Sequence, residues 1–379
     1  MITFKQTAIV ALLASGFFMV SPSWAISYTF IDLGTLGSGL SVANGINNMG
    51  QIAGYSDGIS GGHKAVLWNG ATITVLGTQG SDRGIATAIN NAGQLVGISS
   101  TAGGAGAHAV IWNGIVATDL GTLGGTSSQA QSINDAGVVV GGSNLSASTY
   151  PFHAALWDGI TKTDLGTLGG YYSEAFGINN SGQTVGISYT SGNTSQRAVL
   201  WDGITTTDLG TLGGRDSWAY AINNSGQIVG WSTTSGYNGV NHATLWNGTT
   251  ATDLGTLGGT SSEAFSINNK GQVVGDSYTG NGVNHASLWD DTTAIDLNSF
   301  LTPSEISAGW VLSTAKGIND NGWIVGNAVN NLLGVNHAFL LTPISVVPEP
   351  SIVWLLVSGL GLLAFTRRWK SKNIQPQYC

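Results

Sequence analysis

The chain has 379 residues and a formal net charge of −8, and only 8% of its residues are charged. An acidic chain repels phosphate backbones, and no basic stripe interleaves with the aromatic residues, so the composition argues against nucleic-acid binding. The single cysteine excludes an internal disulfide.

Residues 1–25 are predicted to be a signal peptide. Lys5 supplies a positive start, residues 8–20 are apolar, and Ser23-Trp24-Ala25 resembles a cleavage site with small residues at both key positions. We therefore expect an exported protein that is extracellular or held at the cell surface.

From residue 26 to residue 343 a cassette of about 44 residues recurs seven times. Self-similarity at a fixed period indicates units that stack on one another, because one unit alone cannot bury its apolar face. Each cassette contains an Ile-Asn pair, and in all but the last a Trp follows that pair. The Ile-Asn pairs begin at Ile46, Ile89, Ile133, Ile178, Ile222, Ile267 and Ile318.

The sixth cassette shows the pattern of one unit. Two short runs, Ala264–Ile267 and Gln272–Gly275, flank an Asn/Gly cluster, which is typical of a hairpin turn. The runs His285–Trp289 and Thr293–Leu297 follow, also joined by a turn. Each cassette is therefore predicted to hold four short strands and no helix, which is the size of one propeller blade.

The two ends of the repeat array complement each other. The array begins with a lone fourth-type strand, Tyr28–Leu33, whereas the last cassette has the first three strand types (315–318, 323–325 and 337–341) and no fourth. Pairing of the first strand onto the last three would remove two exposed sheet edges. The sequence thus predicts an all-β fold, a seven-bladed β-propeller of four-stranded blades closed by the N-terminal strand.

The C-terminal residues form three successive parts. Residues 344–350 are a linker with the motif Pro348-Glu349-Pro350, residues 351–366 are an apolar segment, and residues 367–379 are a basic tail that begins with Arg367 and Arg368. The positive-inside rule predicts a cytoplasmic tail and an outward-facing repeat domain. The alternative is a plain C-terminal membrane anchor.

This three-part arrangement resembles the PEP-CTERM sorting signal of Gram-negative bacteria. The resemblance implies that an exosortase processes the protein and that the apolar segment is transmembrane until this processing removes the tail. It also implies that the processed protein is delivered to the cell surface or outside the cell. The repeats resemble a second family, the HAF-repeat extracellular proteins, through His337-Ala338-Phe339, Asp253–Gly259 and Ile267–Gly275. That resemblance implies an extracellular location and repeat architecture, and no activity.

The six histidines belong to one repeated feature. Five fill the same slot, four residues before the Trp or its equivalent, and His63 lies beside that slot; Lys64 and Arg197 fill it in two copies. A ring of histidines raises the possibility of a metal site, but one residue per blade does not converge on a point. His, Lys and Arg share an N–H donor, so we expect a structural hydrogen bond to backbone or to a repeated Asp, no bound metal and no cofactor. This repeated Asp begins the phrase Asp-Leu-Gly at Asp32, Asp119, Asp164, Asp208 and Asp253, with degraded copies at Val75 and Asp296. The repeated Trp and Asn pairs are likewise expected to be structural, filling space between blades and satisfying loop amides.

Function in a repeat protein is expected where the copies differ. The residues four before each Ile are Val42, Ile85, Gln129, Glu174, Trp218, Glu263 and Thr314, and they are predicted to line one mouth of a central channel. Aromatics beside carboxylates and arginines are typical of carbohydrate sites. The ligand-binding candidates are Arg83, Tyr171, Tyr172, Glu174, Arg215, Asp216, Trp218 and Glu263.

Three functional hypotheses follow. The first is a non-enzymatic binding module for an extracellular polysaccharide or a protein partner. The second is a glycan-active hydrolase or lyase with Glu174 and Glu263 as its acid–base pair, which requires carboxyl groups about 5–9.5 Å apart. The third is a purely structural surface protein, with solvated loop residues at the variable positions.

Overall fold

The computed structural model describes residues 27–344 except 60, 103–105, 147–150 and 236–238. Tyr28–Pro343 forms one compact unit. The predicted signal peptide, the Pro-Glu-Pro motif, the apolar segment and the basic tail all lie outside the described residues. None of the helices in the described residues has both the length and the apolar character that a membrane crossing needs.

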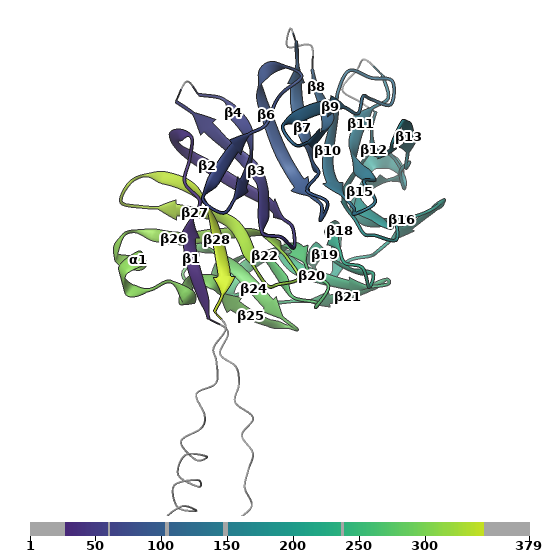
Figure 1. Cartoon of the computed structure of the whole chain (residues 1–379). Helices are drawn as coiled ribbons and strands as arrows, with labels where there is room; N and C mark the ends of the chain where they lie inside the picture. The colour runs from purple at the N-terminus through teal and green to yellow at the C-terminus, as the bar shows by residue number, and fades with distance from the viewer. Residues whose placement is uncertain (1–26, 60, 103–105, 147–150, 236–238, 345–379) are drawn as a thin grey trace, which may run out of the picture. The chain divides into compact units, whose positions relative to one another are not determined.

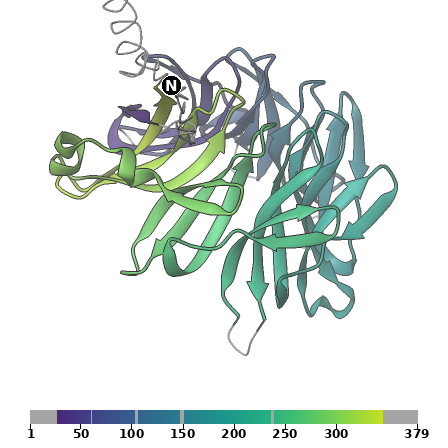
Figure 2. The same ribbon diagram turned by 90° about the horizontal axis from the view of Figure 1, so that it is seen from below.

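Tyr28–Pro343 is an all-β, propeller-like arrangement of four-stranded antiparallel sheets, here called blades, which follow one another in chain order (Figures 1 and 2). The N-terminal strand is β1 (Tyr28–Asp32). The first three blades are β2 (Gly37–Ile46), β3 (Gln51–Gly58), β4 (His63–Asn69) and β5 (Thr72–Val75); β6 (Gly80–Ile89), β7 (Leu95–Thr101), β8 (Ala107–Asn113) and β9 (Val116–Asp119); and β10 (Ser128–Ile133), β11 (Val139–Asn144), β12 (Phe152–Asp158) and β13 (Thr161–Asp164).

The next three blades and the last one complete the unit. They are β14 (Gly169–Ile178), β15 (Thr184–Thr190), β16 (Gln196–Asp202) and β17 (Thr205–Asp208); β18 (Gly213–Ile222), β19 (Gln227–Thr234), β20 (Asn241–Asn247) and β21 (Thr250–Asp253); β22 (Gly258–Ile267), β23 (Val273–Thr279), β24 (Asn284–Asp290) and β25 (Thr293–Asp296); and β26 (Trp310–Ile318), β27 (Ile324–Asn330) and β28 (Val335–Pro343). A short 3₁₀ helix, η2 (Ser191–Asn193), lies between β15 and β16.

The sixth blade shows why the cassette folds as predicted. Ala264 and Ile267 on β22 are buried, and β22 pairs with β23 through the turn that follows Ile267. Gly271 closes this turn at a φ of +82°, a conformation that side chains with a Cβ rarely adopt. The prediction of four strands per cassette is confirmed, and β22 extends several residues further toward its N-terminus than the alternating pattern indicated.

The apolar cores lie between neighbouring blades. Trp289 of the sixth blade is fully buried and packs in one cluster with Ala264, Ile267 and with Val229 of the fifth blade. A cluster of this kind recurs along the array, which agrees with the predicted role of the repeated Trp between blades. Each blade therefore depends on its neighbour for burial of its apolar face.

The first and last strands of the unit pair with each other. β1 runs antiparallel to β28, with Tyr28 opposite Pro343 and Asp32 opposite Phe339, and the two strands lie side by side in Figure 1 (purple and yellow). Tyr28 is buried in the cluster of the last blade, and this burial raises its pKa to about 12. The lone N-terminal strand thus supplies the fourth strand that the last cassette lacks.

Two short helical segments precede the last blade, although the strand pattern of the cassettes predicts no helix. They are η3 (Leu297–Phe300) and α1 (Pro303–Ser307). Thr302 and Glu305 form a capping box around the start of α1, with Pro303 in its first turn. The Thr-Pro-Ser-Glu sequence is a known helix-start signal, so this insertion could have been predicted.

Candidate functional site: the central cavity

The first strand of every blade lines a central cavity. At one end a hollow of about 170 Å³ is lined by the Ile-Asn turns of β2, β6, β10, β14, β18, β22 and β26. Further along the same strands a second hollow of about 230 Å³ is lined by the residues one and two places before each Ile. The first strands therefore face a common axis, and the two hollows differ in their chemistry.

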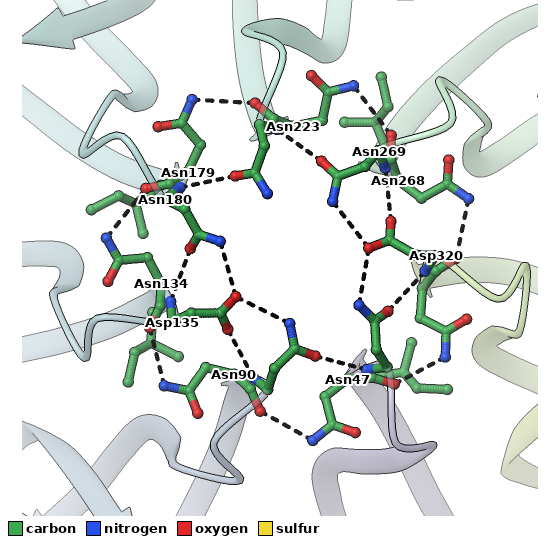
Figure 3. A pocket seen from close by; sticks show the side chains of 18 of the residues that line it. Asn47, Asn90, Asn134, Asp135, Asn179, Asn180, Asn223, Asn268, Asn269 and Asp320 are labelled. Carbon is green, nitrogen blue, oxygen red and sulfur yellow. Dashed lines mark hydrogen bonds between the residues drawn. The ribbon is translucent and has the colours of Figure 1, made fainter.

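The hollow at the Ile-Asn turns is surrounded by a cycle of amide hydrogen bonds (Figure 3). Asn47 Oδ1 accepts from the backbone N–H groups of Met49 (3.1 Å) and Gln51 (3.0 Å), and its Nδ2 donates to the backbone oxygen of Asn90 in the next blade (3.0 Å). The same inter-blade bond repeats around the array, and Asn319 Nδ2 returns it to the Asn47 oxygen at 2.9 Å. Its other donors are Asn90, Asn134, Asn179, Asn223 and Asn268.

The next residue of each turn forms a second cycle. The backbone N–H of each of these residues donates to the side-chain oxygen of its counterpart in the following blade, as from Asn48 to Asn91 Oδ1 at 2.9 Å. The cycle returns from the Asp320 N–H to Asn48 Oδ1 at 2.9 Å. Its members are Asn48, Asn91, Asp135, Asn180, Asn224, Asn269 and Asp320.

The two carboxylates of this second cycle are each held by amides on both sides. Asp135 Oδ2 accepts from the side chains of Asn91 (3.1 Å) and Asn180 (2.9 Å), and Asp320 Oδ2 does the same with its two neighbours. Burial alone would raise the pKa of Asp135 and Asp320, but the hydrogen bonds to their oxygens outweigh it and hold both pKa values below the usual range.

These cycles satisfy the turn amides internally, so we assign this end of the cavity to the framework. The expectation that the Asn pairs satisfy loop amides is confirmed. The closed inter-blade cycle was not predicted, because nothing within one cassette tells which groups the neighbouring blade presents.

The second hollow is asymmetric. It is lined on the fourth, fifth and sixth blades by Phe176, Tyr220 and Phe265, and on the first two blades by the small polar side chains of Asn44 and Thr87. The last blade contributes a cation, since Lys316 lies with its Nζ 3.4 Å from the centre of the Phe265 ring. The positions that vary between copies therefore gather aromatic groups on one side of the cavity.

The aromatic groups are in mutual contact. Trp218 stacks on Phe176 (ring centres 5.8 Å apart) and on Trp231 (5.7 Å), and Tyr220 lies 5.2 Å from Phe265. The indole N–H of Trp231 donates to the Tyr220 hydroxyl at 3.2 Å. We call these five residues the aromatic wall: Phe176, Trp218, Tyr220, Trp231 and Phe265.

Two carboxylates and a lysine adjoin the aromatic wall. Glu263 on β22 is the register partner of Asp276 on β23, so their side chains leave the same face of the sixth blade. Both line a further hollow of about 220 Å³ together with Asn284. Burial and the neighbouring Asp276 charge raise the pKa of Glu263, burial raises that of Asp276, and burial lowers that of Lys316 although both carboxylates oppose this.

Glu174, the other carboxylate of the proposed acid–base pair, has a different environment. It is 5% exposed, and its oxygens accept from the Tyr172 hydroxyl (2.5 Å) and from the side chains of Gln129 (2.5 Å) and Gln131 (2.8 Å). Burial raises its pKa, and these hydrogen bonds offset part of the rise. The carboxylate paired with Glu263 in the sheet is Asp276, which was not a candidate because it lies on the second strand of its blade.

The remaining residues that the sequence suggested for ligand binding lie in the N-terminal halves of β6, β14 and β18. Tyr172 stacks on Phe152 with ring centres 5.5 Å apart, and Tyr171, 41% exposed, stacks on Tyr189. Arg215 is exposed and contacts Asp216 and the backbone of Thr194. Arg83 is exposed in the second blade, two blades before the one that carries Glu174.

The histidines form the structural pairs that we expected. In every blade with a histidine in the repeated slot, its Nδ1 lies 2.7–2.9 Å from the repeated Asp. In the first blade Val75 replaces that Asp, and Lys64 instead contacts Asp82 of the second blade. His63, beside the slot, pairs with Asp57 at 2.5 Å. The five pairs are His108–Asp119, His153–Asp164, His242–Asp253, His285–Asp296 and His337–Asp32.

No cluster of three or more His, Cys, Asp or Glu side chains suited to a metal ion occurs among the described residues. The repeated His–Asp pairs are therefore best explained as ties between the third and fourth strands of each blade, as their positions on adjacent strands indicate.

No family model and no curated protein matches this chain. Among solved structures it is similar to a mutant of the lectin AAL of Aleuria aurantia in complex with Fucα1-6GlcNAc, at 12% identity and a TM-score of 0.35, over 69% of this chain and 97% of that one. A likeness this distant does not bear on the function of this chain.

Proposed function

We propose that this protein is an exported, surface-associated binding module that holds an extracellular polysaccharide in the central cavity, beside the aromatic wall, without catalysing a reaction. The observation that carries the proposal is the asymmetry of the cavity. Aromatic rings in contact with one another adjoin Glu263 and Asp276 on one side, and Asn44 and Thr87 occupy the equivalent places on the other.

This chemistry suits a sugar. The flat apolar face of a pyranose stacks on aromatic rings, and its hydroxyl groups need well-placed acceptors and donors. Trp218 and Tyr220 of the fifth blade supply partly exposed rings, and Glu263 and Asp276 supply acceptors in the neighbouring sixth blade. A purely structural channel would need none of this variation between copies.

We further propose that the scaffold is a closed seven-bladed propeller. The pairing of β1 with β28 and the return of the amide cycle from Asn319 to Asn47 support closure. A closed ring leaves no sheet edge for non-specific pairing, which suits a protein exposed outside the cell.

The route to the surface is proposed from the sequence. The signal peptide supports export, and the Pro-Glu-Pro motif, apolar segment and basic tail support processing by an exosortase. The C-terminal segment would hold the protein in the membrane until it is processed.

A hydrolase or lyase is the second candidate function, and one observation favours it. Glu263 and Asp276 are neighbouring carboxylates with raised pKa values in a cavity, which is how acid–base pairs are often arranged. Glu174 fits this role less well because three donors already occupy its oxygens.

Binding of the purified protein to an array of bacterial exopolysaccharides, with analysis of new reducing ends and unsaturated products, tests these proposals together. Specific retention without new products supports the binding module. Turnover that Glu263→Gln abolishes would establish an enzyme instead. No retention on any glycan would contradict the proposed ligand class and favour a structural or protein-binding role.

A further inference from the structure

The hollow of about 220 Å³ that residues of the sixth blade line is rich in hydrogen-bond acceptors. Glu263 and Asp276 bring two carboxylates to it, and Lys316 of β26 is the cation that interacts with both. Asn284 lines the same hollow, and its Oδ1 is buried and has no hydrogen-bond partner among the described residues.

The orientation of Asn284 follows from its other contacts. Its Nδ2 donates to the backbone oxygen of Ser313 at 3.5 Å, and its amide also serves the Asp276 carboxylate as a donor. Exchange of its amide nitrogen and oxygen would bring an oxygen against these two acceptors, so the unpaired atom is the oxygen. In the neighbouring last blade, Asn327 Oδ1 is likewise buried and unpaired within the described part of the chain.

Two neighbouring donors are already engaged. The Thr314 hydroxyl donates to Asp276 Oδ2 at 3.1 Å, and Trp231 donates to the Tyr220 hydroxyl. Lys316 lies over the Phe265 ring, which gains electrostatically from a cation on its face. The protein thus already places one ammonium group against this aromatic wall and still leaves a surplus of negative and acceptor groups.

We propose that this hollow accepts a primary ammonium group of the ligand, so that the polysaccharide recognised by this protein carries free amino sugars. The proposal rests on the proposed function, and it specifies the chemical class of the glycan. An ammonium group brings three donors and one positive charge to the two carboxylates and to the unpaired oxygen of Asn284, and the aromatic wall stacks on the sugar ring. An acetylated amine has one donor and no charge, and a uronic acid adds a like charge.

The pKa values of the site agree with this assignment. Burial raises the pKa of both Glu263 and Asp276, with the charge of Asp276 as a further cause for Glu263. Because burial is the main cause, a cationic group of the ligand beside these carboxylates would favour their charged forms and lower both pKa values again.

The test is calorimetric titration of the purified protein with four β-1,4-linked oligosaccharides of equal length, built from glucosamine, N-acetylglucosamine, glucose and glucuronic acid. We expect glucosamine to bind at least about tenfold more tightly than N-acetylglucosamine, which corresponds to about 1.4 kcal/mol. Glucuronic acid should bind most weakly.

Charge variants separate an ammonium site from a general glycan site. Glu263→Gln and Asp276→Asn should each lose most of the preference for glucosamine and keep the weaker affinity for glucose. Lys316→Gln should raise the affinity for glucosamine several-fold, because it frees the face of Phe265 and one carboxylate. Glu305→Gln, which removes a carboxylate from the capping box of α1 and keeps a residue type that the box accepts, is the matched control and should change nothing. Unfolding temperatures of all variants show whether each is folded.

Equal affinity for glucosamine and N-acetylglucosamine, or tighter binding of glucuronic acid, would overturn the ammonium site and leave the polysaccharide module intact. A glucosamine preference that survives both Glu263→Gln and Asp276→Asn would also overturn it. Absence of binding to all four sugars and to the exopolysaccharide array would overturn the proposed function itself.

Discussion

His337 Nδ1 lies 2.9 Å from Oδ1 of Asp32, although the two residues are 305 positions apart in the chain. This contact repeats the His–Asp pair found within other blades, but here its two members come from opposite ends of the array. The last blade is thus completed by the same side-chain pair that ties the third and fourth strands elsewhere.

Loss of this pair is expected to weaken the junction of the two ends. Asp32→Ala should lower the free energy of unfolding by about 1 kcal/mol, the net value of a partly exposed hydrogen bond. Asp164→Ala, which breaks the equivalent pair within the third blade, is the matched control and should cost a similar amount. Urea unfolding followed by tryptophan fluorescence measures both.

Removal of residues 28–32 should cost far more than either substitution. It deletes the register pairs of β1, exposes the edge of β28 and removes the buried Tyr28 ring. We expect a large loss of thermal stability and concentration-dependent aggregation through the exposed strand edge. An unchanged unfolding temperature would contradict ring closure by β1.

The amide cycle makes a graded prediction. Asn179 forms two bonds to its own turn, one to the Gln183 side chain at 2.9 Å and one to the next blade, so Asn179→Ala should cost about 2–4 kcal/mol. Asn134 lacks the side-chain bond because Val138 stands where the other blade has Gln183. Asn134→Ala should therefore lower the free energy of unfolding by about 1 kcal/mol less. The reverse order would show that the bond to the Gln183 side chain does not stabilise the turn as the geometry indicates.

The two carboxylates of the second cycle should make the stability of the folded protein fall in acid. The pKa values of Asp135 and Asp320 are lowered in the folded state, so their contribution to stability is present above the unfolded pKa and is lost as pH falls through the folded pKa. The double variant Asp135→Asn, Asp320→Asn should be less stable than wild type at pH 7, because its amides oppose the neighbouring amide donors. The difference should narrow toward pH 3, and unfolding midpoints at both pH values test this. A difference in unfolding midpoint between wild type and the double variant that does not change with pH would show that the ionised carboxylates do not stabilise the fold.

Glu174 is predicted to hold the framework of the cavity and not to contact the ligand. Glu174→Gln replaces one acceptor with a donor toward the Tyr172 hydroxyl or the Gln129 side chain, and should cost about 1–2 kcal/mol of stability. Its effect on glycan affinity should stay within about threefold, or about 0.7 kcal/mol. A loss of binding as large as that of Glu263→Gln would place Glu174 in the binding site.

Much of the fold could be predicted because the same strand and turn pattern recurs in each cassette. The Asn and Gly of the turns and the alternating apolar positions define the strands locally, and the unmatched strand Tyr28–Leu33 indicated where it would pair. The capping box at Thr302 and Glu305 was present in the sequence, yet the strong strand pattern of the repeats led away from a helix there.

The site was less predictable, since its members depend on register and on neighbouring blades. Trp218, Glu174 and Glu263 were found by comparing first strands at one position. Asp276 lies on a second strand, and only the register of β22 with β23 places it beside Glu263. Lys316 sits two residues from the compared position, in the last blade, so no pattern within one cassette connects it to Phe265.

The most direct test of the central claim is titration of wild type, Trp218→Phe and Trp218→Ala with the exopolysaccharide that the array identifies. Trp218 contributes an indole ring to the aromatic wall, and its indole N–H donates to the Gln196 side chain at 2.7 Å. If the cavity is the binding site, affinity falls at least about tenfold (about 1.4 kcal/mol) in Trp218→Ala and less in Trp218→Phe, with both variants folded. Equal affinity in all three proteins would mean that the glycan binds elsewhere and that the aromatic wall is packing alone.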